Sequence, residues 1–208
     1  MNVNEIFALY PCLSFFAYFF GRFRFIIAPI EEIIALLPRS GNVIDIGCGH
    51  GFITNAIAIR YPNVKVRGMD INKSRIDVAK SSLAKRTNIS FSVLDVIKKS
   101  LPKQKFDGIV CFDLLHHLPQ ETQIKIITQA YNLLKKNGVF IIKDIDTVPV
   151  YKYLWNLLHD MLVTDQQVHC RHHQEWIDIL KENKFKIEKL IFSKKGWLYP
   201  HFIIVSQK

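Results

Sequence analysis

Three glycines and three acidic residues stand where a ligand could be bound, because they follow or end apolar stretches typical of buried strands. The glycines occupy alternate positions after the run 43–46 and are Gly47, Gly49 and Gly51. The acids belong to three successive stretches of this kind and are Asp45, Asp70 and Asp95. A glycine-rich turn after a strand lets the backbone approach a ligand closely. These residues therefore predict a small-molecule site at the ends of neighbouring strands.

The spacing of the glycines indicates which ligand to expect. The dinucleotide fingerprint G-x-G-x-x-G would need a glycine at position 52, which is Phe52. The chain also has no G-x-x-x-x-G-K-[ST] sequence, which excludes a P-loop. Asp45 would repel a pyrophosphate, but it suits an ammonium group. Asp70 suits a ribose diol and Asp95 an exocyclic amine, and these three groups occur together in S-adenosylmethionine.

Five segments resemble, in order, the motifs of class I S-adenosylmethionine-dependent methyltransferases. They are VIDIGCGHG (43–51), GMDINKSRIDVAK (68–80), FSVLDV (91–96), FDGIVCFDLLHHL (106–118) and LLKKNGVFIIKDID (133–146). The resemblance covers roughly residues 30–145. It implies a Rossmann-like fold, an enzyme and S-adenosylmethionine as the cofactor.

The resemblance also implies which residues bind the cofactor. The set is Asp45, Gly47, Cys48, Gly49, Gly51, Met69, Asp70, Ile71, Asp95, Val96 and Phe112. The glycine turn would lie under the methionine moiety, whose amino group Asp45 would bind directly or through water. Asp70 would hold the ribose hydroxyls. Asp95 and the backbone of Val96 would bind the adenine edge.

Residues that could act in catalysis follow the stretch 106–112. They are Asp113, His116 and His117. Methyl transfer is an in-line displacement at an activated sulfonium carbon, so the enzyme mainly aligns the acceptor. A base is needed only when the acceptor carries a proton of high pKa. Either histidine is therefore expected to line the cofactor pocket or to act as that base, and both interpretations stay open here.

Acceptor specificity is expected from the aromatic N-terminal segment 1–29 and from an insertion at about 147–173. The residues expected to contact the acceptor are Tyr10, Phe19, His159, Arg171 and His172. A small hydrophobic or lipid-like acceptor and O-methylation are favoured. The alternatives are an RNA or protein acceptor, or a cofactor-binding protein without catalysis. The histidines at 169–173 form one crowded cluster without a second ligand pair, so no metal site is predicted.

Alternating strand and helix signals must position these residues. Strands are expected within 42–47, 65–70, 89–96, 106–115, 139–146, 185–194 and 201–208, and a long helix from 120 is expected to stop at Gly138. This order predicts an α/β fold with a doubly wound, seven-stranded, mostly parallel sheet. The short link before the last strand predicts that this strand is antiparallel. Residues 30–208 would form the methyltransferase domain, with 1–29 as an added helical segment.

Composition narrows the setting of the protein. The net charge is +10, from 28 Lys and Arg against 18 Asp and Glu, but the basic residues are spread along the chain, so nucleic acid is not the expected partner. The four cysteines form no C-x-x-C pair and no disulfide-like framework, which is typical of a reducing cytoplasm. The sequence carries no expectation about oligomeric state.

The apolar N-terminal run at 6–30 needs a separate interpretation. Pro11, Gly21, Arg22 and Arg24 interrupt it, so it is too short for a spanning helix. It also lacks the features of a signal peptide. We expect either a helix that covers the site or docks on the core, or an interfacial helix at the inner face of the membrane. The expected location is the cytoplasm, with peripheral membrane contact as the second alternative.

Overall fold

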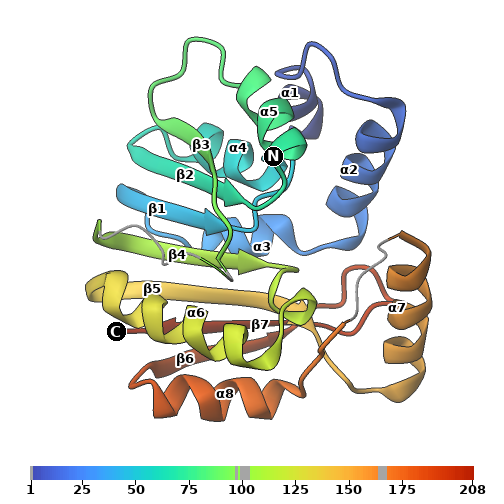
Figure 1. Ribbon diagram of the computed structural model, residues 1–208, viewed down its shortest axis with the longest axis vertical. Coiled ribbons are helices and arrows are strands. Elements are labelled where there is room, and N and C mark those ends of the chain that lie inside the picture. Colours follow the sequence, from blue (N-terminus) through green and yellow to red (C-terminus); the bar gives the residue numbers. More distant parts are fainter. Residues whose placement is uncertain (1, 97, 99–103, 164–167) are drawn as a thin grey trace.

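A seven-stranded sheet forms the centre of the molecule (Figure 1). The computed structural model describes residues 2–96, 98, 104–163 and 168–208. The strands are β1 (Gly41–Ile46), β2 (Val64–Asp70), β3 (Ile89–Val93), β4 (Phe106–Phe112), β5 (Leu134–Ile145), β6 (Lys186–Phe192) and β7 (His201–Gln207). Their order is β3-β2-β1-β4-β5-β7-β6. β7 runs antiparallel to β5 and β6, and the other neighbouring strands are parallel, which confirms the predicted fold class.

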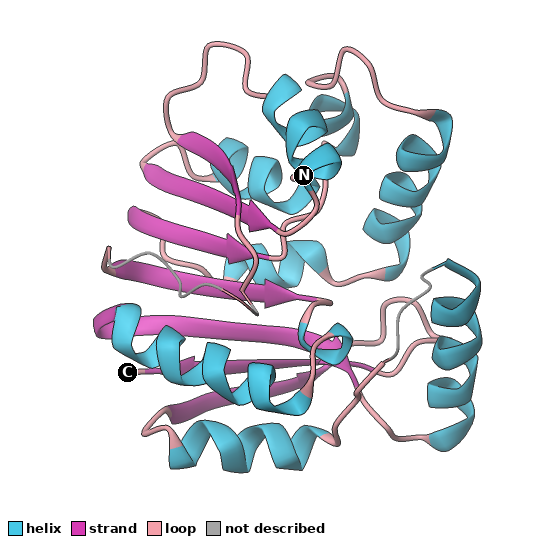
Figure 2. Ribbon diagram, viewed as in Figure 1, coloured by secondary structure: helices cyan, strands magenta, loops and turns pink. Residues whose placement is uncertain are grey.

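Helices cover both faces of this sheet (Figure 2). They are α1 (Val3–Phe7), α2 (Phe15–Ile27), α3 (Ile30–Ala35), α4 (Phe52–Arg60), α5 (Lys73–Ser81), the short helix η1 (Leu115–His117), α6 (Gln120–Leu133), α7 (Val150–Val163) and α8 (His173–Glu182). Successive strand residues point to opposite faces. Val110 therefore packs with residues of α1 to α5, while Cys111 packs with residues of α6 and α8.

The N-terminal segment packs on the rest of the molecule next to the glycine turn. Ile6 and Phe7 of α1 are buried in the core that contains α4, and the ring of Phe7 stacks on Phe52 at 4.9 Å between centroids. Ser14 caps α2 by accepting a hydrogen bond from the Ala17 amide, and Phe25 buries the inner face of that helix. No helix in the described part of the chain is both long and apolar enough to cross a membrane.

One predicted boundary is wrong. The long helix stops at Leu133 instead of continuing to Gly138, and β5 begins at Leu134. Leu134 is buried and pairs with Phe106 of β4, so its side chain is better placed by an extended backbone than by another helical turn. Asn137, not Gly138, takes the left-handed conformation there, with φ of 63°.

Candidate active site

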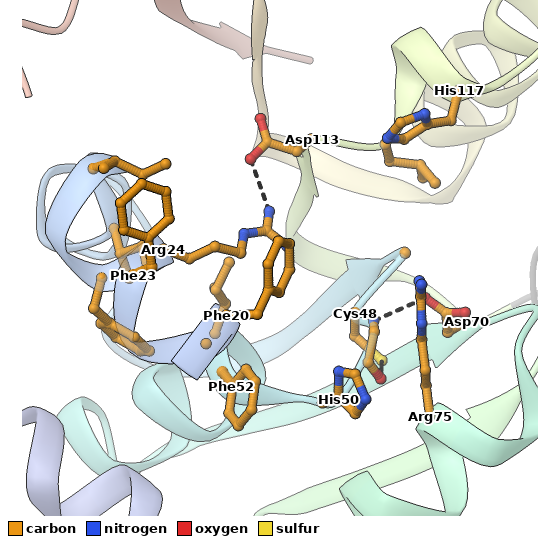
Figure 3. Close-up of a pocket in the computed structure, with 18 of the residues that line it drawn as sticks. Phe20, Phe23, Arg24, Cys48, His50, Phe52, Asp70, Arg75, Asp113 and His117 are labelled. Atoms are coloured by element: carbon orange, nitrogen blue, oxygen red, sulfur yellow. Dashed lines mark hydrogen bonds and ion pairs between the residues drawn. The ribbon is translucent and has the colours of Figure 1, made fainter. Parts of the chain in front are cut away.

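A cavity of about 330 Å³ lies beyond the carboxyl ends of the central strands, under α2 and α7. Of the predicted site residues, its lining contains Gly47, Cys48, Gly49, Asp70, Ile71, Asp113, His116, His117 and His159. Crevices at this edge are where open α/β sheets bind their ligands. Figure 3 shows Arg24 and Asp113 on one side of the glycine turn and Asp70 on the other.

The glycine turn leaves its backbone open at one position. Gly47, Gly49 and Gly51 all have left-handed φ values, of 79°, 56° and 78°. A Cβ atom at Gly47 would lie 2.7 Å from Leu114, and one at Gly51 would lie 2.6 Å from Phe91. A Cβ at Gly49 would meet no atom within 4 Å, so this residue faces the cavity. The outer two glycines are therefore needed for packing, whereas Gly49 gives a ligand access to the backbone.

Asp70 fixes this turn from the end of β2. Its Oδ2 accepts a hydrogen bond of 2.8 Å from the Gly49 amide, and its Oδ1 accepts one of 2.8 Å from the Asn72 amide. The carboxylate is thus oriented by two backbone donors at the cavity wall, as a ribose-binding acid needs to be.

Asp45 lies beneath the turn and outside the cavity lining. It is buried and accepts a hydrogen bond of 2.6 Å from the Thr54 hydroxyl. Burial raises the pKa of Asp45 to about 6, against the effect of the Thr54 bond. Its predicted contact with an amino group stays a prediction, since the carboxylate now faces Thr54.

Asp113 joins two cations at the end of β4. Its Oδ2 accepts from Nη2 of Arg24 at 2.7 Å, and its Oδ1 accepts from Nζ of Lys143, which is fully buried. Burial raises the pKa of Asp113, but Lys143 and Arg24 outweigh burial and hold that pKa well below its usual range. Both cations also lie over the ring of Phe112, at 5.1 and 5.0 Å from its centroid. A carboxylate held this way is a poor proton acceptor, so a base role for Asp113 gains no support.

His116 is paired with an acid that sequence reasoning did not single out as a site residue. Its Nδ1 lies in hydrogen-bond contact with Asp144 of β5, and its backbone amide donates to Asp144 at 3.2 Å. Both side chains are buried, and His116 lines the cavity. The His117 ring packs against His116 with 4.0 Å between centroids. The arrangement gives one oriented histidine at the wall where a reacting group would lie.

Several predicted residues lie away from this cavity. The predicted residues outside its lining are Asp45, Gly51, Met69, Asp95, Val96, Phe112, Tyr10, Phe19, Arg171 and His172. All ten belong to the part of the chain that the structure describes. Asp95 follows β3, which ends at Val93, and pairs with Lys98 at 3.8 Å. The adenine contacts assigned to Asp95 and Val96 stay predictions.

Four of the five predicted acceptor residues have other contacts in the structure. The Tyr10 hydroxyl donates to the His50 carbonyl at 2.8 Å and so supports the glycine turn. Phe19 is 56 % exposed on the outer side of α2. Arg171 donates to Gln123 at 2.7 Å, and His172 caps α8. Their contact with an acceptor stays a prediction.

The histidine-rich stretch forms a cluster that could hold a metal ion. Ligand atoms of Asp146, His172 and His173 lie within 4.8 Å of one another. However, His173 already bonds Asp146 at 2.7 Å, and Nδ1 of His172 accepts from the Gln174 amide at 3.2 Å. These contacts hold the start of α8, which accounts for the cluster without an ion.

The cavity also contains residues that sequence reasoning missed as site residues. They include Arg24, Asn156, Tyr199 and His201, while Lys143 and Asp144 support the wall from β5. The only signal for the last two is the charged pair inside the apolar run 139–145. Buried charges need partners, so this pair could have been assigned to a site.

Comparison with known proteins identifies the family. The family model described as "Methyltransferase domain" matches residues 38–201. A ubiquinone biosynthesis O-methyltransferase of Coxiella burnetii is 31% identical over 138 residues, which are 62% of this chain and 56% of that protein. A protein of Rickettsia prowazekii described as uncharacterized is 29% identical over 139 residues, 64% of this chain and 55% of that protein. The chain thus spans little more than half the length of these relatives.

Solved structures share the fold at low sequence identity. An S-adenosylmethionine-dependent methyltransferase from Mesorhizobium loti gives a TM-score of 0.72 at 17% identity and covers 87% of this chain and 99% of its own. Magnesium protoporphyrin IX methyltransferase from Synechocystis, solved with bound SAH, gives 0.69 at 18% identity, covering 95% and 89%. The chain belongs to the methyltransferase domain family, with the class I S-adenosylmethionine-dependent fold. The cofactor of this family is S-adenosylmethionine.

The residues at the cavity fit this cofactor. Gly49 leaves open space above its backbone, and Asp70 presents an oriented carboxylate beside it. Ile71 is an apolar side chain in the lining directly after Asp70, where an adenine ring could pack. Arg24 approaches from α2 on the other side of the turn (Figure 3).

Proposed function

We propose that the protein transfers a methyl group from S-adenosylmethionine to a hydroxyl oxygen of a small, hydrophobic acceptor, with His116 as the general base. The observation that carries this proposal is the buried pair of His116 and Asp144 in the wall of the cofactor cavity. A histidine held by a carboxylate is oriented for proton transfer.

Three residues would hold the cofactor in this proposal. Asp70 would bind the ribose hydroxyls, and the Gly49 backbone would lie against the methionine portion. Arg24 would bind the methionine carboxylate, because it is a guanidinium in the lining whose described side-chain hydrogen bonds go to Asp113 alone. When bound, S-adenosylmethionine supplies an electrophilic methyl group and a neutral thioether leaving group.

The chain's part in the reaction is to align the acceptor and remove its proton. Nδ1 of His116 contacts Asp144, and in this proposal Nε2 takes the hydroxyl proton. The acceptor oxygen forms a bond to the methyl carbon as the carbon–sulfur bond breaks, and that electron pair stays on sulfur. General-base catalysis of this kind contributes about 10²–10⁴-fold.

The lining favours an apolar acceptor. Phe16, Phe20 and Phe23 of α2 line the cavity beside Arg24. The Coxiella relative is named as an O-methyltransferase of ubiquinone biosynthesis, and an Ilyobacter polytropus relative, 30% identical over 109 residues, as a malonyl-[acyl-carrier protein] O-methyltransferase. Both names support oxygen as the methylated atom.

The test is methyl transfer to a panel of phenols, alcohols, carboxylic acids, amines and thiols, followed by release of S-adenosylhomocysteine. We expect turnover with oxygen acceptors of apolar character. His116→Asn should lower kcat about 10²–10⁴-fold and leave S-adenosylhomocysteine affinity unchanged. His117→Asn is the matched control and should cost much less. Turnover confined to amines or thiols, or equal losses in both variants, would contradict the proposal.

We also propose that the exposed apolar faces of α2 and α7 contact an anionic lipid surface. Exposed apolar side chains on these helices are Phe15, Phe16, Tyr18, Phe19, Phe23, Ile26, Val150, Tyr151, Leu154, Trp155 and Leu158. Both helices border the cavity, and residues 14–30 include two arginines and no acid. Aromatic faces with basic neighbours favour such a surface.

Vesicle flotation tests this contact. Phe15→Ser with Phe19→Ser and Ile26→Ser should abolish binding of the full chain to phosphatidylserine-containing vesicles. Phe192→Ser is the matched control, since Phe192 is also exposed but lies at the end of β6. Unchanged flotation, or a stable dimer that the triple substitution dissociates, would contradict lipid contact.

A further inference from the structure

His201 is a buried histidine in the cavity wall that the proposed methyl transfer does not use. It begins β7 opposite Ile145 of β5, at the strand ends that border the cavity. Only 4 % of the residue is exposed. Its ring stacks on Tyr199, with 5.5 Å between centroids and an angle of 9°. The ring is therefore held in one orientation by its neighbours.

Neither ring nitrogen of His201 makes a hydrogen bond of good geometry with any described residue. The carbonyl of Ile27 lies near the ring. It does not accept a hydrogen bond of good geometry from the ring, so the ring N–H is left for a ligand. Buried polar atoms without partners are rare in native proteins, and a functional role is one of the explanations for them.

The surroundings of His201 determine what it can offer. Burial is the main cause, and the charge of Lys143 the second, that lowers the pKa of His201 to about 3. The ring is therefore neutral at physiological pH. A neutral imidazole has one N–H donor and one acceptor nitrogen. Lys143 and Arg24 are the nearby cations, and Asp113 is the anion between them. Two cations around one anion favour a ligand atom with partial or full negative charge.

We propose that His201 holds a second oxygen of the acceptor, a carbonyl or carboxylate oxygen that accepts a hydrogen bond from its ring. This inference rests on the proposed function, because it places the methylated hydroxyl at His116 and the second oxygen at His201. His116, His201 and Asp113 all line the same cavity, so one ligand in it can reach both histidines. The acceptor would then be a small apolar molecule that carries both a hydroxyl and a carbonyl or carboxylate group.

Matched acceptors test this specificity. We expect wild-type kcat/KM to be at least about 10-fold higher for hydroxyaryl ketones or hydroxybenzoates than for the parent phenols, the worth of one hydrogen bond to a buried partner. His201→Phe should remove this preference through KM, while His201→Gln, which keeps an N–H donor, should restore part of it. Comparing the ketone acceptors with the carboxylate acceptors shows whether the second oxygen is neutral or anionic. A preference that survives in His201→Phe would overturn the proposal.

Thermal denaturation tests it without turnover. A buried polar side chain that serves ligand binding lowers the stability of the ligand-free protein. His201→Phe should therefore raise Tm by roughly 2–4 °C. With S-adenosylhomocysteine present, the hydroxyaryl ketone should raise Tm of the wild type and not of His201→Phe. A lower Tm for both His201→Phe and His201→Gln would show a structural role and overturn the proposal. Absence of methyl transfer to every acceptor, with these shifts intact, would instead count against the proposed function.

Discussion

The guanidinium of Arg24 donates to the carboxylate of Asp113 across 2.7 Å and 89 residues of sequence. This ion pair joins α2 to the end of β4 and holds α2 over the cavity. Asp113 has a left-handed backbone, with φ of 48°, and also binds the buried ammonium of Lys143. Strained backbone of this kind persists where the surroundings fix it firmly.

Asp113→Asn should be the most destabilising change in this cluster. It leaves Lys143 buried beside a neutral partner, at a cost of about 3–5 kcal/mol in the free energy of unfolding. Arg24→Gln removes a partly exposed charge and should cost about 1 kcal/mol or less. Lys143→Met in the Asp113→Asn background should recover most of the loss. Urea denaturation measures all three, and equal effects of Asp113→Asn and Arg24→Gln would count against this account.

The ion pairs of Asp113 make the stability of the fold depend on pH with a defined sign. The pKa of Asp113 is depressed in the folded protein and is about 3.9 in an unfolded chain. Its contribution to stability is therefore present above about pH 4 and is lost as the pH falls below that value. Wild type and Asp113→Asn should differ most at neutral pH and converge in acid. A gap between them that widens as the pH falls would refute the assignment.

The pH dependence that Asp45 gives to the stability should have the opposite sign. Burial raises its pKa to about 6, so between about pH 4 and 6 the folded state binds more protons than the unfolded state. Stability then falls as the pH rises through this window. Asp45→Asn can still accept the Thr54 bond and should gain about 2–3 kcal/mol relative to wild type between pH 4 and 7. A constant difference across that range would contradict a raised pKa.

Gly49→Ala should separate cofactor binding from stability. The new Cβ meets no protein atom within 4 Å, so the left-handed backbone is the main cost, about 1 kcal/mol. The methyl group would project into the cavity, and S-adenosylhomocysteine affinity should fall at least about 10-fold, since one misplaced contact of 1.4 kcal/mol is worth that factor. Gly51→Ala is the contrasting variant, because its Cβ would lie 2.6 Å from Phe91 and destabilise the fold. Full affinity in Gly49→Ala would show that no ligand approaches this backbone.

Local sequence patterns were enough to predict the strands of the sheet and the glycine turn. The apolar runs ending at Asp45 and Asp70 form neighbouring parallel strands, and the turn between β1 and α4 borders the cavity. The end of α6 was missed because Leu134 is fixed by its pairing with Phe106, a contact that helical periodicity does not report.

The partners of the site residues depend on topology. His116 meets Asp144 28 residues later, and His201 reaches the cavity only because β7 inserts between β5 and β6. Tyr10 was expected in the acceptor wall because it is aromatic, yet its hydroxyl bonds the His50 carbonyl. A sequence shows that such residues are present but not where their polar atoms point.

The central claim is that the cavity at Asp70 binds S-adenosylmethionine, and calorimetry tests it most directly. Wild-type protein should bind S-adenosylhomocysteine with one site per chain. Asp70→Asn should weaken binding by about 10–150-fold, the worth of hydrogen bonds to a charged group. Asp77→Asn is the control, since Asp77 pairs with Lys73 on the exposed face of α5 and should leave affinity unchanged. Absence of binding in the wild type, or equal affinity in folded Asp70→Asn, would contradict the account.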